Sequence, residues 1–446
     1  MEFLDKFVIP QSLEHIKLLH YLATLVLFLF VPFISIVFGS TALSLHFRKK
    51  GTSESDKGLI YFAKDLIGMF TVNKNVGIVL GIIPVITLML IYAQLLHSAN
   101  NSAVTYLFIA SILIIVSFIF IYTYRYLMSF DIIFNSLQNF ESDNKTIVND
   151  FNKLSKASRT ISLRVGHYGL ILLVLSIWFL LGGWNVALHP EQADKQGIFA
   201  VLFSLDVIIR LLSFLSFAMA LTGGAILFRF FFWEGGIKGL DEKYLGLVKN
   251  IGVKIAFYFS ALIPIFLVIN LTIFPKAALS SSIFIYSGLT LFFLFICYNI
   301  LYAMTKNEKV NYSGVLFILL LLAMCFSLTK DQLAMNNATE LQTLKLGKKY
   351  EVMMASLTGE TVKVPVINGE DVFQTRCSAC HAFDYKIVGP SYNESLKKYE
   401  GKLKDLVAFI LNPKKINPDY IPMPNPGLKP SEAKAVAKYI LKTYKK

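Results

Sequence analysis

The sequence predicts an all-α protein in which an eight-helix transmembrane bundle is followed by a small, polar α-helical domain. Three observations predict this fold class. Of the 446 residues, 55% are hydrophobic and only 16% are charged, whereas a soluble domain carries about 25% charged residues. Apolar runs of membrane-spanning length recur up to about residue 330. From there to the end of the chain the composition is polar.

Eight apolar runs are long enough to cross a bilayer, which needs about 20 consecutive apolar residues. They cover residues 18–45, 75–97, 103–128, 165–186, 198–232, 251–274, 281–304 and 312–329. Three of them contain a proline, and such kinks are tolerated where neighbouring helices satisfy the freed backbone groups. The N-terminus shows neither the basic segment nor the cleavage site of a signal peptide, so the first run is expected to direct insertion.

Basic residues alternate between the connections and so predict the orientation of the helices. The first, third, fifth and seventh connections are rich in Lys and Arg, whereas the second has none, the fourth only Lys195 and the sixth only Lys276. Because basic connections stay in the cytoplasm, both termini are expected outside. Residues 131–164, in the third connection, are predicted to form an amphipathic helix or helix pair on the cytoplasmic side.

The polar region contains two cysteines and a histidine in the motif Cys377-Ser-Ala-Cys380-His381. Two thiols at positions i and i+3 of one helical turn can add to the two vinyl groups of haem, and the histidine that follows presents its imidazole to the iron. A thioredoxin-like dithiol would need a neighbouring βαβ pattern, and a zinc site would need a second Cys/His pair. The sequence shows neither, so the motif predicts one covalently attached c-type haem with His381 as an axial ligand.

The other axial ligand is expected to be a soft donor further along the chain. Met423 stands in Ile421-Pro-Met-Pro-Asn, between predicted helices at residues 402–411 and 431–444. The prolines on both sides fix the backbone, and core packing poorly explains a methionine with polar and proline neighbours. Thioether ligation would saturate the iron and raise its reduction potential, which favours electron transfer over oxygen binding.

Residues 369–446 resemble the class I c-type cytochromes. The resemblance rests on the order of Cys377-x-x-Cys380-His381, Gly389-Pro390, Met423-Pro-Asn and a closing helix rich in Ala and Lys. It implies His381 and Met423 as the two axial ligands of the iron. It also implies that the Pro390 carbonyl orients the His381 ring, a role of the kind that partners of metal ligands commonly have.

Three segments are therefore predicted: a transmembrane domain at residues 1–330, an extracytoplasmic linker at 331–368, and the cytochrome domain at 369–446. The second half of the linker alternates in polarity and is expected to form a short hairpin. The net charge of +14 is spread over loops and tail without a basic helix, so no nucleic-acid partner is expected. Lysines of the tail either steer an acidic redox partner or form a solvated face; they are Lys397, Lys398, Lys402, Lys404, Lys414 and Lys415.

Few titratable residues fall within the predicted spans, where charge is costly and often functional. Asp206 is the one carboxylate in the runs, and Arg210 follows one helical turn later. A neutral structural pair is the favoured interpretation, with quinone or proton handling as the alternative. His20 and His97 are expected at the outer ends of the first two spans, either as interfacial side chains or as ligands of a b-type haem held between them.

The first five spans are similar at two places to subunit I of the cytochrome bd quinol oxidases. These places are Phe28-Leu-Phe-Val-Pro32 and Arg210-Leu-Leu-Ser-Phe, the latter followed by Thr222-Gly223. Where the resemblance implies haem-ligating histidines, this chain has Leu27 and Ser213, and the third span lacks the buried glutamates of that family. The resemblance therefore implies a related membrane region that lacks those ligands.

Together these features predict a membrane-anchored, mono-haem c-type cytochrome that transfers electrons on the outer face of the cytoplasmic membrane. It is expected to act within a respiratory complex, with the lipid bilayer, redox proteins and other subunits as partners and quinol as a further candidate. Two alternatives are a component of a bd-type terminal oxidase, with haem b in the helices, and a non-catalytic anchor for the cytochrome domain. No catalytic residue is assigned.

Overall fold

The computed structural model describes residues 11–71, 73–96, 102–136, 145–189, 197–237, 239–307, 310–358, 368–415 and 420–444. Within these ranges all regular secondary structure is helical, which confirms the predicted all-α class. The chain divides into two compact units. The larger unit consists of Lys17–Phe274 and Ser282–Met335, and the smaller one contains described residues of Met1–Ile16, Pro275–Ser281 and Asn336–Lys446.

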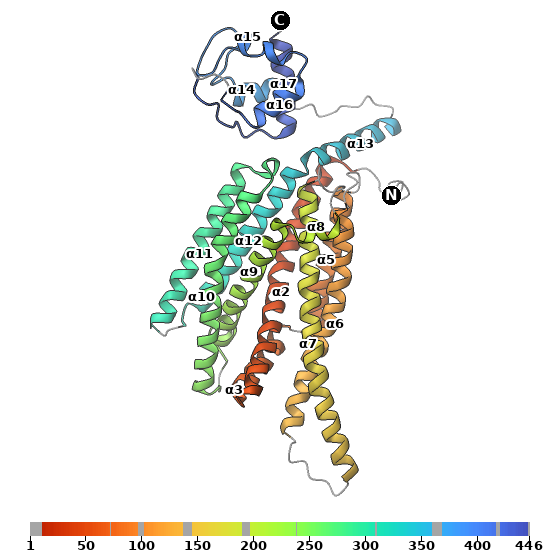
Figure 1. Ribbon diagram of the computed structural model, residues 1–446, viewed down its shortest axis with the longest axis vertical. Coiled ribbons are helices and arrows are strands. Elements are labelled where there is room, and N and C mark those ends of the chain that lie inside the picture. The colour runs from red at the N-terminus through yellow and green to blue at the C-terminus, as the bar shows by residue number, and fades with distance from the viewer. Residues whose placement is uncertain are drawn as a thin grey trace. The chain divides into compact units, whose positions relative to one another are not determined.

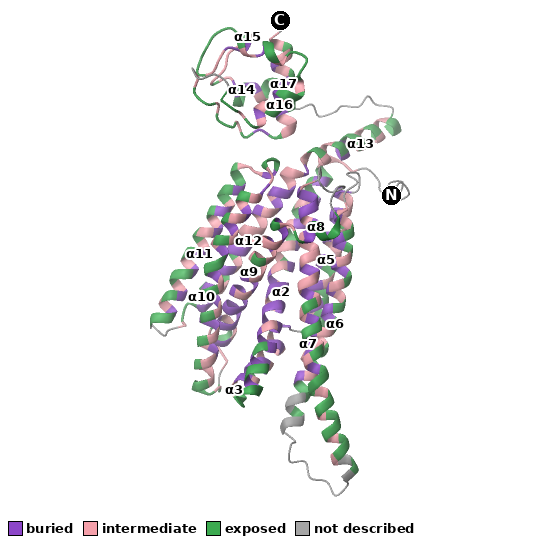
Figure 2. Cartoon of the chain, in the orientation of Figure 1, coloured by how far each residue is buried: buried purple, intermediate pink, exposed green. Residues whose placement is uncertain are grey.

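Eight helices of the described chain are long and apolar enough to cross a membrane, as the sequence predicts (Figure 1). They are α2 (Leu13–Ser53), the continuous segment of α4, η1 and α5 (Lys74–Leu96), α6 (Ala103–Ser136), α7 (Lys145–Leu188), α9 (Leu205–Phe231), α10 (Glu242–Ile273), α11 (Ser281–Asn307) and α12 (Ser313–Ala338). A short helix, α3 (Lys57–Phe70), follows α2. Figure 2 shows buried faces along these helices alternating with exposed ones.

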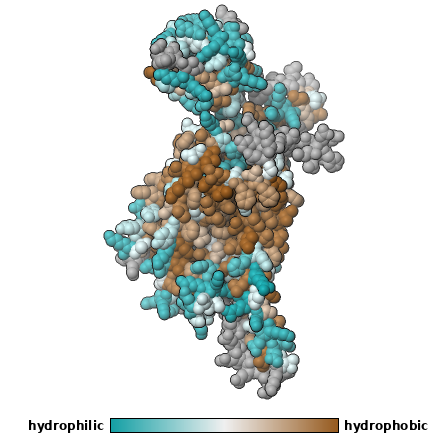
Figure 3. Space-filling view, viewed as in Figure 1, coloured by the Kyte–Doolittle hydropathy of each residue, from teal (hydrophilic) through white to brown (hydrophobic). Residues whose placement is uncertain are grey.

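The exposed faces of the spans carry large apolar side chains, as Figure 3 shows for one side of the molecule. Phe295 of α11 is 69% exposed and Tyr258 of α10 is 65% exposed. Soluble monomers rarely expose apolar patches of more than a few hundred Å². These faces therefore suit contact with lipid tails, and the protein is a multi-pass membrane protein.

α6 packs along α7, and α9 packs along α10. Close packing around α9 depends on glycines at two crossings, one with α10 and one with α2. A Cβ atom on Gly223 of α9 would lie 2.6 Å from the backbone nitrogen of Ala256 in α10. A Cβ atom on Gly39 of α2 would overlap the hydroxyl of Thr222 in α9. Since interfaces between transmembrane helices gain most of their stability from such close approach, these glycines fix the position of α9 against its neighbours.

The fifth predicted run, 198–232, is divided into two helices, α8 (Ile198–Leu202) and α9. Ser204 has an extended backbone, and its side chain caps α9 by accepting from the amide of Val207. The indole of Trp178 donates to the carbonyl of Leu202 at 2.8 Å, which satisfies a group freed by the break. The single helix expected from hydrophobicity is therefore wrong here, because local capping competes with continuation of the helix.

The polar segment 131–164 does not form a separate helix pair among the described residues. Its first part continues α6 to Ser136, and its last part, from Lys145, is the start of α7. Residues 137–144 lie outside the described ranges. The two spans thus extend as helices beyond their apolar parts (Figure 1).

The first half of the hairpin expected in the linker is helical instead, so that prediction is wrong there; its second half, at residues 361–365, lies outside the described residues. α12 continues to Ala338, beyond the predicted boundary at residue 330, and α13 covers Glu340–Thr358. The segment Leu341–Ser356 is rich in Leu, Lys and Met and contains no proline. These are strong helix formers, and their preference outweighs the short alternation of polarity on which the hairpin prediction depended.

The cytochrome domain contains α14 (Gly369–Arg376), α15 (Tyr392–Ser395), η5 (Lys397–Tyr399), α16 (Leu403–Leu411) and α17 (Pro430–Thr443). The predicted helices 402–411 and 431–444 correspond to α16 and α17. The core joins α14, α16 and α17 through Phe373, Leu406, Ile410, Val436 and Ile440. α14 crosses α17 so closely that a Cβ atom on Gly369 would overlap the Ala435 carbonyl. This crossing of the first and last helices holds the segment that begins at Cys377.

Candidate functional site

The motif Cys377-Ser-Ala-Cys380-His381 forms a tight turn at the end of α14. The amide of Cys377 donates to Phe373 O at 2.9 Å, and the amides of Cys380 and His381 donate to Cys377 O at 3.1 and 3.0 Å. The amides of Val388 and Gly389 return to Cys380 O at 3.2 and 2.9 Å. The two thiols and the imidazole therefore project from one turn, which the following loop closes.

The ring of His381 is held on three sides. Its Nδ1 lies 3.1 Å from the carbonyl oxygen of Pro390, which accepts the proton and so fixes the tautomer. The ring stacks on Tyr392 with centroids 5.1 Å apart and planes 10° apart. A Cβ atom on Gly389 would overlap the imidazole. Nε2 has no hydrogen bond among the described residues and is the nitrogen available to an iron ion.

The contact between His381 and Pro390 is the one implied by the resemblance to c-type cytochromes. A carbonyl acceptor on Nδ1 both orients a ligand histidine and makes its other nitrogen a stronger donor to the metal. The roles of Gly389 and Tyr392 were not predicted. The dipeptide Gly389-Pro390 was the only sequence signal at this place, and it does not indicate that Tyr392 stacks on the histidine.

The two thiols differ in burial. Cys377 is buried, Cys380 is partly exposed, and neither forms a disulfide bond. Burial raises the pKa of the Cys377 thiol, and a hydrogen bond from Tyr392 opposes this effect. Phe373, Phe383 and Tyr392 surround the motif with their rings 5.3–6.1 Å apart. A macrocycle attached here would have an aromatic and apolar wall on one side, which fits a haem.

Met423 lies on the irregular segment that precedes α17 and is partly buried. The side chain of Asn425 anchors this segment by donating to Leu411 O at 3.2 Å. The same side chain accepts from the amide of Gly427 at 2.9 Å, and Gly427 has the left-handed φ of +64° that favours glycine. The thioether is thus carried by a loop whose backbone is fixed on its C-terminal side.

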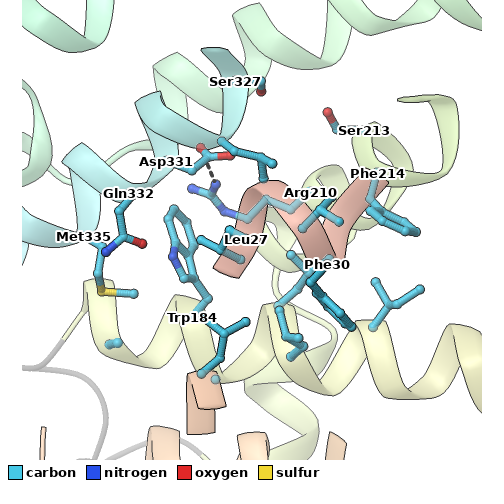
Figure 4. A pocket seen from close by; sticks show the side chains of 18 of the residues that line it. Leu27, Phe30, Trp184, Arg210, Ser213, Phe214, Ser327, Asp331, Gln332 and Met335 are labelled. Atoms are coloured by element: carbon cyan, nitrogen blue, oxygen red, sulfur yellow. Dashed lines mark hydrogen bonds and ion pairs between the residues drawn. The ribbon is translucent and has the colours of Figure 1, made fainter. Parts of the chain in front are cut away.

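The membrane unit contains a second polar site, built around Arg210. Its Nε lies 2.8 Å from Oδ1 of Asp206, so the predicted pair is formed, and both side chains are buried. Two residues of α12, Lys330 and Asp331, join this pair. Oδ1 of Asp331 lies 3.5 Å from Arg210 Nη1 and 3.0 Å from Lys330 Nζ. The Cζ atom of Arg210 lies 4.1 Å from the centroid of the Trp184 ring, so the indole covers the guanidinium. Figure 4 shows Arg210 with Asp331 and Trp184 beside it.

Sequence reasoning missed Lys330 and Asp331 because the eighth run was expected to end at residue 329. The helix continues, and the pair therefore lies within α12.

The histidines considered as ligands of a b-type haem are His20 and His97. His20 is partly buried in α2, while His97 lies outside the described residues. A b-type haem between them stays a prediction.

The C-terminal domain is a small helical unit in which two thiols and an oriented histidine lie on one turn. The sequence profile of the cytochrome c family matches residues 366–443. Cytochrome c-551 of Pseudomonas denitrificans is 41% identical over 78 residues, which are 16% of this chain and 94% of that protein. Cytochrome c-551 of Azotobacter vinelandii is 39% identical over 77 residues, again 16% and 94%.

Cytochrome c-552 of Hydrogenobacter thermophilus is 38% identical over 72 residues, which are 15% of this chain and 72% of that protein. No solved structure matches the chain. The chain therefore belongs to the cytochrome c family through its C-terminal domain. That domain carries a covalently bound c-type haem and transfers electrons, and the apolar helices anchor it in a membrane.

Proposed function

We propose that the protein is a mono-haem c-type cytochrome that transfers electrons on the outer face of the cytoplasmic membrane, as a subunit of a respiratory complex. The observation that carries the proposal is the turn of Cys377, Cys380 and His381, in which Pro390 orients the ligand histidine. The motif occurs once in the sequence, which supports one haem c per chain. When bound, the haem supplies a one-electron redox centre.

The protein's own residues would hold this group in defined ways. The thiols of Cys377 and Cys380 would attach it covalently, and Nε2 of His381 and the thioether of Met423 would bind the iron from its two faces. An iron with both axial positions filled exchanges electrons without binding oxygen. Met423 is tested by Met423→Ala, which should abolish the far-red charge-transfer band of a thioether–iron bond. A spectrum unchanged by the substitution would exclude Met423.

The location outside the membrane is supported by the distribution of basic residues. Connections rich in Lys and Arg alternate with connections that have at most one such residue through all eight spans. In this arrangement the N-terminus, the segment at 331–368 and the cytochrome domain at 369–446 are all extracytoplasmic. A reporter enzyme that folds only outside the cytoplasm, fused after residue 446, should be active. Activity of a cytoplasmic reporter at the same position would contradict the proposal.

Two other functions use the same membrane anchor. One is a component of a bd-type oxidase with haem b among the helices, and the other is a non-catalytic anchor. The positions where the bd resemblance implies histidines are Leu27 and Ser213, and neither side chain can ligate iron as a histidine would. Absorption spectra of the purified chain separate the functions, since b-type or d-type bands would favour the oxidase. We expect a c-type band alone.

The electron donor and acceptor are proposed by chemical class. Lysines of the cytochrome domain, such as Lys397, Lys398 and Lys402, are suited to steering an acidic redox protein. Quinol dissolved in the bilayer is the candidate donor on the membrane side. If docking is electrostatic, the rate of electron exchange with an acidic partner should fall steeply as ionic strength rises. A rate independent of salt would contradict a charged docking surface.

A further inference from the structure

The membrane unit contains a partly open cavity of about 140 Å³. Its wall is formed by six segments, α2, α5, α6, α7, α9 and α10, together with α12, and most of its lining side chains are apolar. Figure 4 shows Leu27 and Phe30 of α2, Trp184 of α7, and Ser213 and Phe214 of α9 around it. The apolar part of the wall is thus aliphatic and aromatic.

One end of the cavity is polar and has atoms without partners. Arg210 is 5% exposed, and its Nη2 has no hydrogen-bond acceptor among the described residues. Asn270 of α10 is 3% exposed, and its Oδ1 likewise has no donor there. Both residues line the cavity. A buried polar atom without a partner is costly, so this end suits a ligand that both accepts and donates hydrogen bonds.

The charge at this end is balanced. Asp206 and Asp331 face Arg210 and Lys330 within ion-pair distance. Because two carboxylates offset two cations, the site offers no net charge to attract an anion such as a phospholipid head group. The fitting ligand is neutral.

The size of the cavity and the chemistry of its wall limit the choice of ligand further. A cavity of about 150 Å³ lined by apolar side chains holds one benzene ring, so this cavity holds one six-membered ring. Drug-sized ligands need roughly 300 Å³ or more, which makes the cavity too small for a porphyrin. Leu27 and Ser213 both line it, and no histidine does. A lipid tail would fill the apolar part but would leave Arg210 and Asn270 without partners.

We propose that this cavity binds the head group of a quinone, with one ring oxygen accepting from Arg210 and, in the reduced form, donating through its hydroxyl to Asn270. The quinone ring is neutral, has the size of the cavity and can place one of its oxygen atoms at the polar end. Its isoprenoid tail is compatible with a site inside the bilayer. The inference deepens the proposed function, because it rests on electron transfer to the haem for its role, but binding itself needs no haem.

Photolabelling tests the proposal directly. The full-length protein in lipid nanodiscs would be exposed to a short-chain azidoubiquinone, and the labelled peptides would be located by mass spectrometry. We expect label on α7, α9 or α12 near the cavity, and its loss on addition of excess decylubiquinone but not of decanol. Label elsewhere, or equal competition by decanol, would overturn the proposal and indicate a site for lipid tails.

Two variants and a matched control make the test specific. Ser213→Phe fills the cavity and should abolish displaceable label, whereas Leu212→Phe adds the same side chain at a position that is 39% exposed on the same helix and should not. Asn270→Leu removes the unpaired acceptor at similar volume and should weaken competition by decylubiquinol, the reduced form that donates to Asn270, about tenfold, the effect of one hydrogen bond. Equal labelling of Ser213→Phe and Leu212→Phe would refute the site.

A haem-free variant separates this inference from the proposed function. Cys377→Ala with Cys380→Ala removes covalent haem attachment outside the cavity and should leave the photolabel unchanged. An intact c-type spectrum in Ser213→Phe would show that the variant chain is made and carries its haem, so that loss of label reports on the cavity. If wild-type protein has its haem but takes no displaceable label, the quinone site is refuted and the cytochrome assignment stands.

Discussion

Replacement of Gly389 by alanine tests how the site holds its ligand histidine. A Cβ atom at this position would overlap Cε1 of His381 and would lie 2.7 Å from Nδ1 and 2.8 Å from Nε2. These distances are well inside van der Waals contact, so the ring must move. Overpacking of this kind costs about 1–3 kcal/mol. A shift of the ring also breaks the 3.1 Å hydrogen bond to Pro390, which contributes about 1 kcal/mol.

The assay is denaturant unfolding of the haem-loaded chain, followed by haem absorption together with the reduction potential. Gly401→Ala is the control, since Gly401 has no neighbour within 4 Å but a φ of +70°, and strain there costs about 1–2 kcal/mol. Both variants should lose stability, and only Gly389→Ala should also change the spectrum and potential of the haem. Wild-type stability and potential in Gly389→Ala would refute the packing argument.

Three further predictions concern the haem and the buried charges. Met423→Ala should lower the reduction potential and let the iron bind cyanide readily, and an unchanged potential would exclude Met423 as a ligand. Cys377→Ala should leave one thioether, seen as a shift of the pyridine haemochrome band, whereas release of free haem into acidic acetone would contradict attachment through both cysteines. Arg210→Met should lower the stability of the membrane unit by about 3–5 kcal/mol, because it leaves buried carboxylates without their cation. The assay is thermal unfolding of the membrane unit, in which Lys50→Met should have little effect, since its ion pair is exposed; equal losses would contradict the role of burial.

Local sequence spacing was sufficient for some of the site. Cys377, Cys380 and His381 lie on one turn, as their spacing predicts, and the pair of Asp206 and Arg210 forms one turn apart on a helix. In such cases the backbone geometry alone sets the distance between side chains. The spacing of residues along the sequence can therefore predict a contact between side chains that lie on one turn.

Contacts between distant segments could not be predicted in this way. Asp331 joins Arg210 from 121 residues further along the chain, and the cavity at this cluster depends on the packing of seven helical segments. The helix α13 was also missed, because a short alternation of polarity was given more weight than helix propensity over 19 residues. In each case tertiary packing or summed propensity decided the outcome.

The haem content of the purified full-length chain tests the central claim most directly. After denaturation and extraction with acidic acetone, a pyridine haemochrome assay measures only the haem that is covalently attached. We expect one c-type haem per chain, absent from Cys377→Ala with Cys380→Ala. Complete extraction of the haem from the wild-type chain, or no haem at all, would contradict the assignment as a membrane-anchored c-type cytochrome.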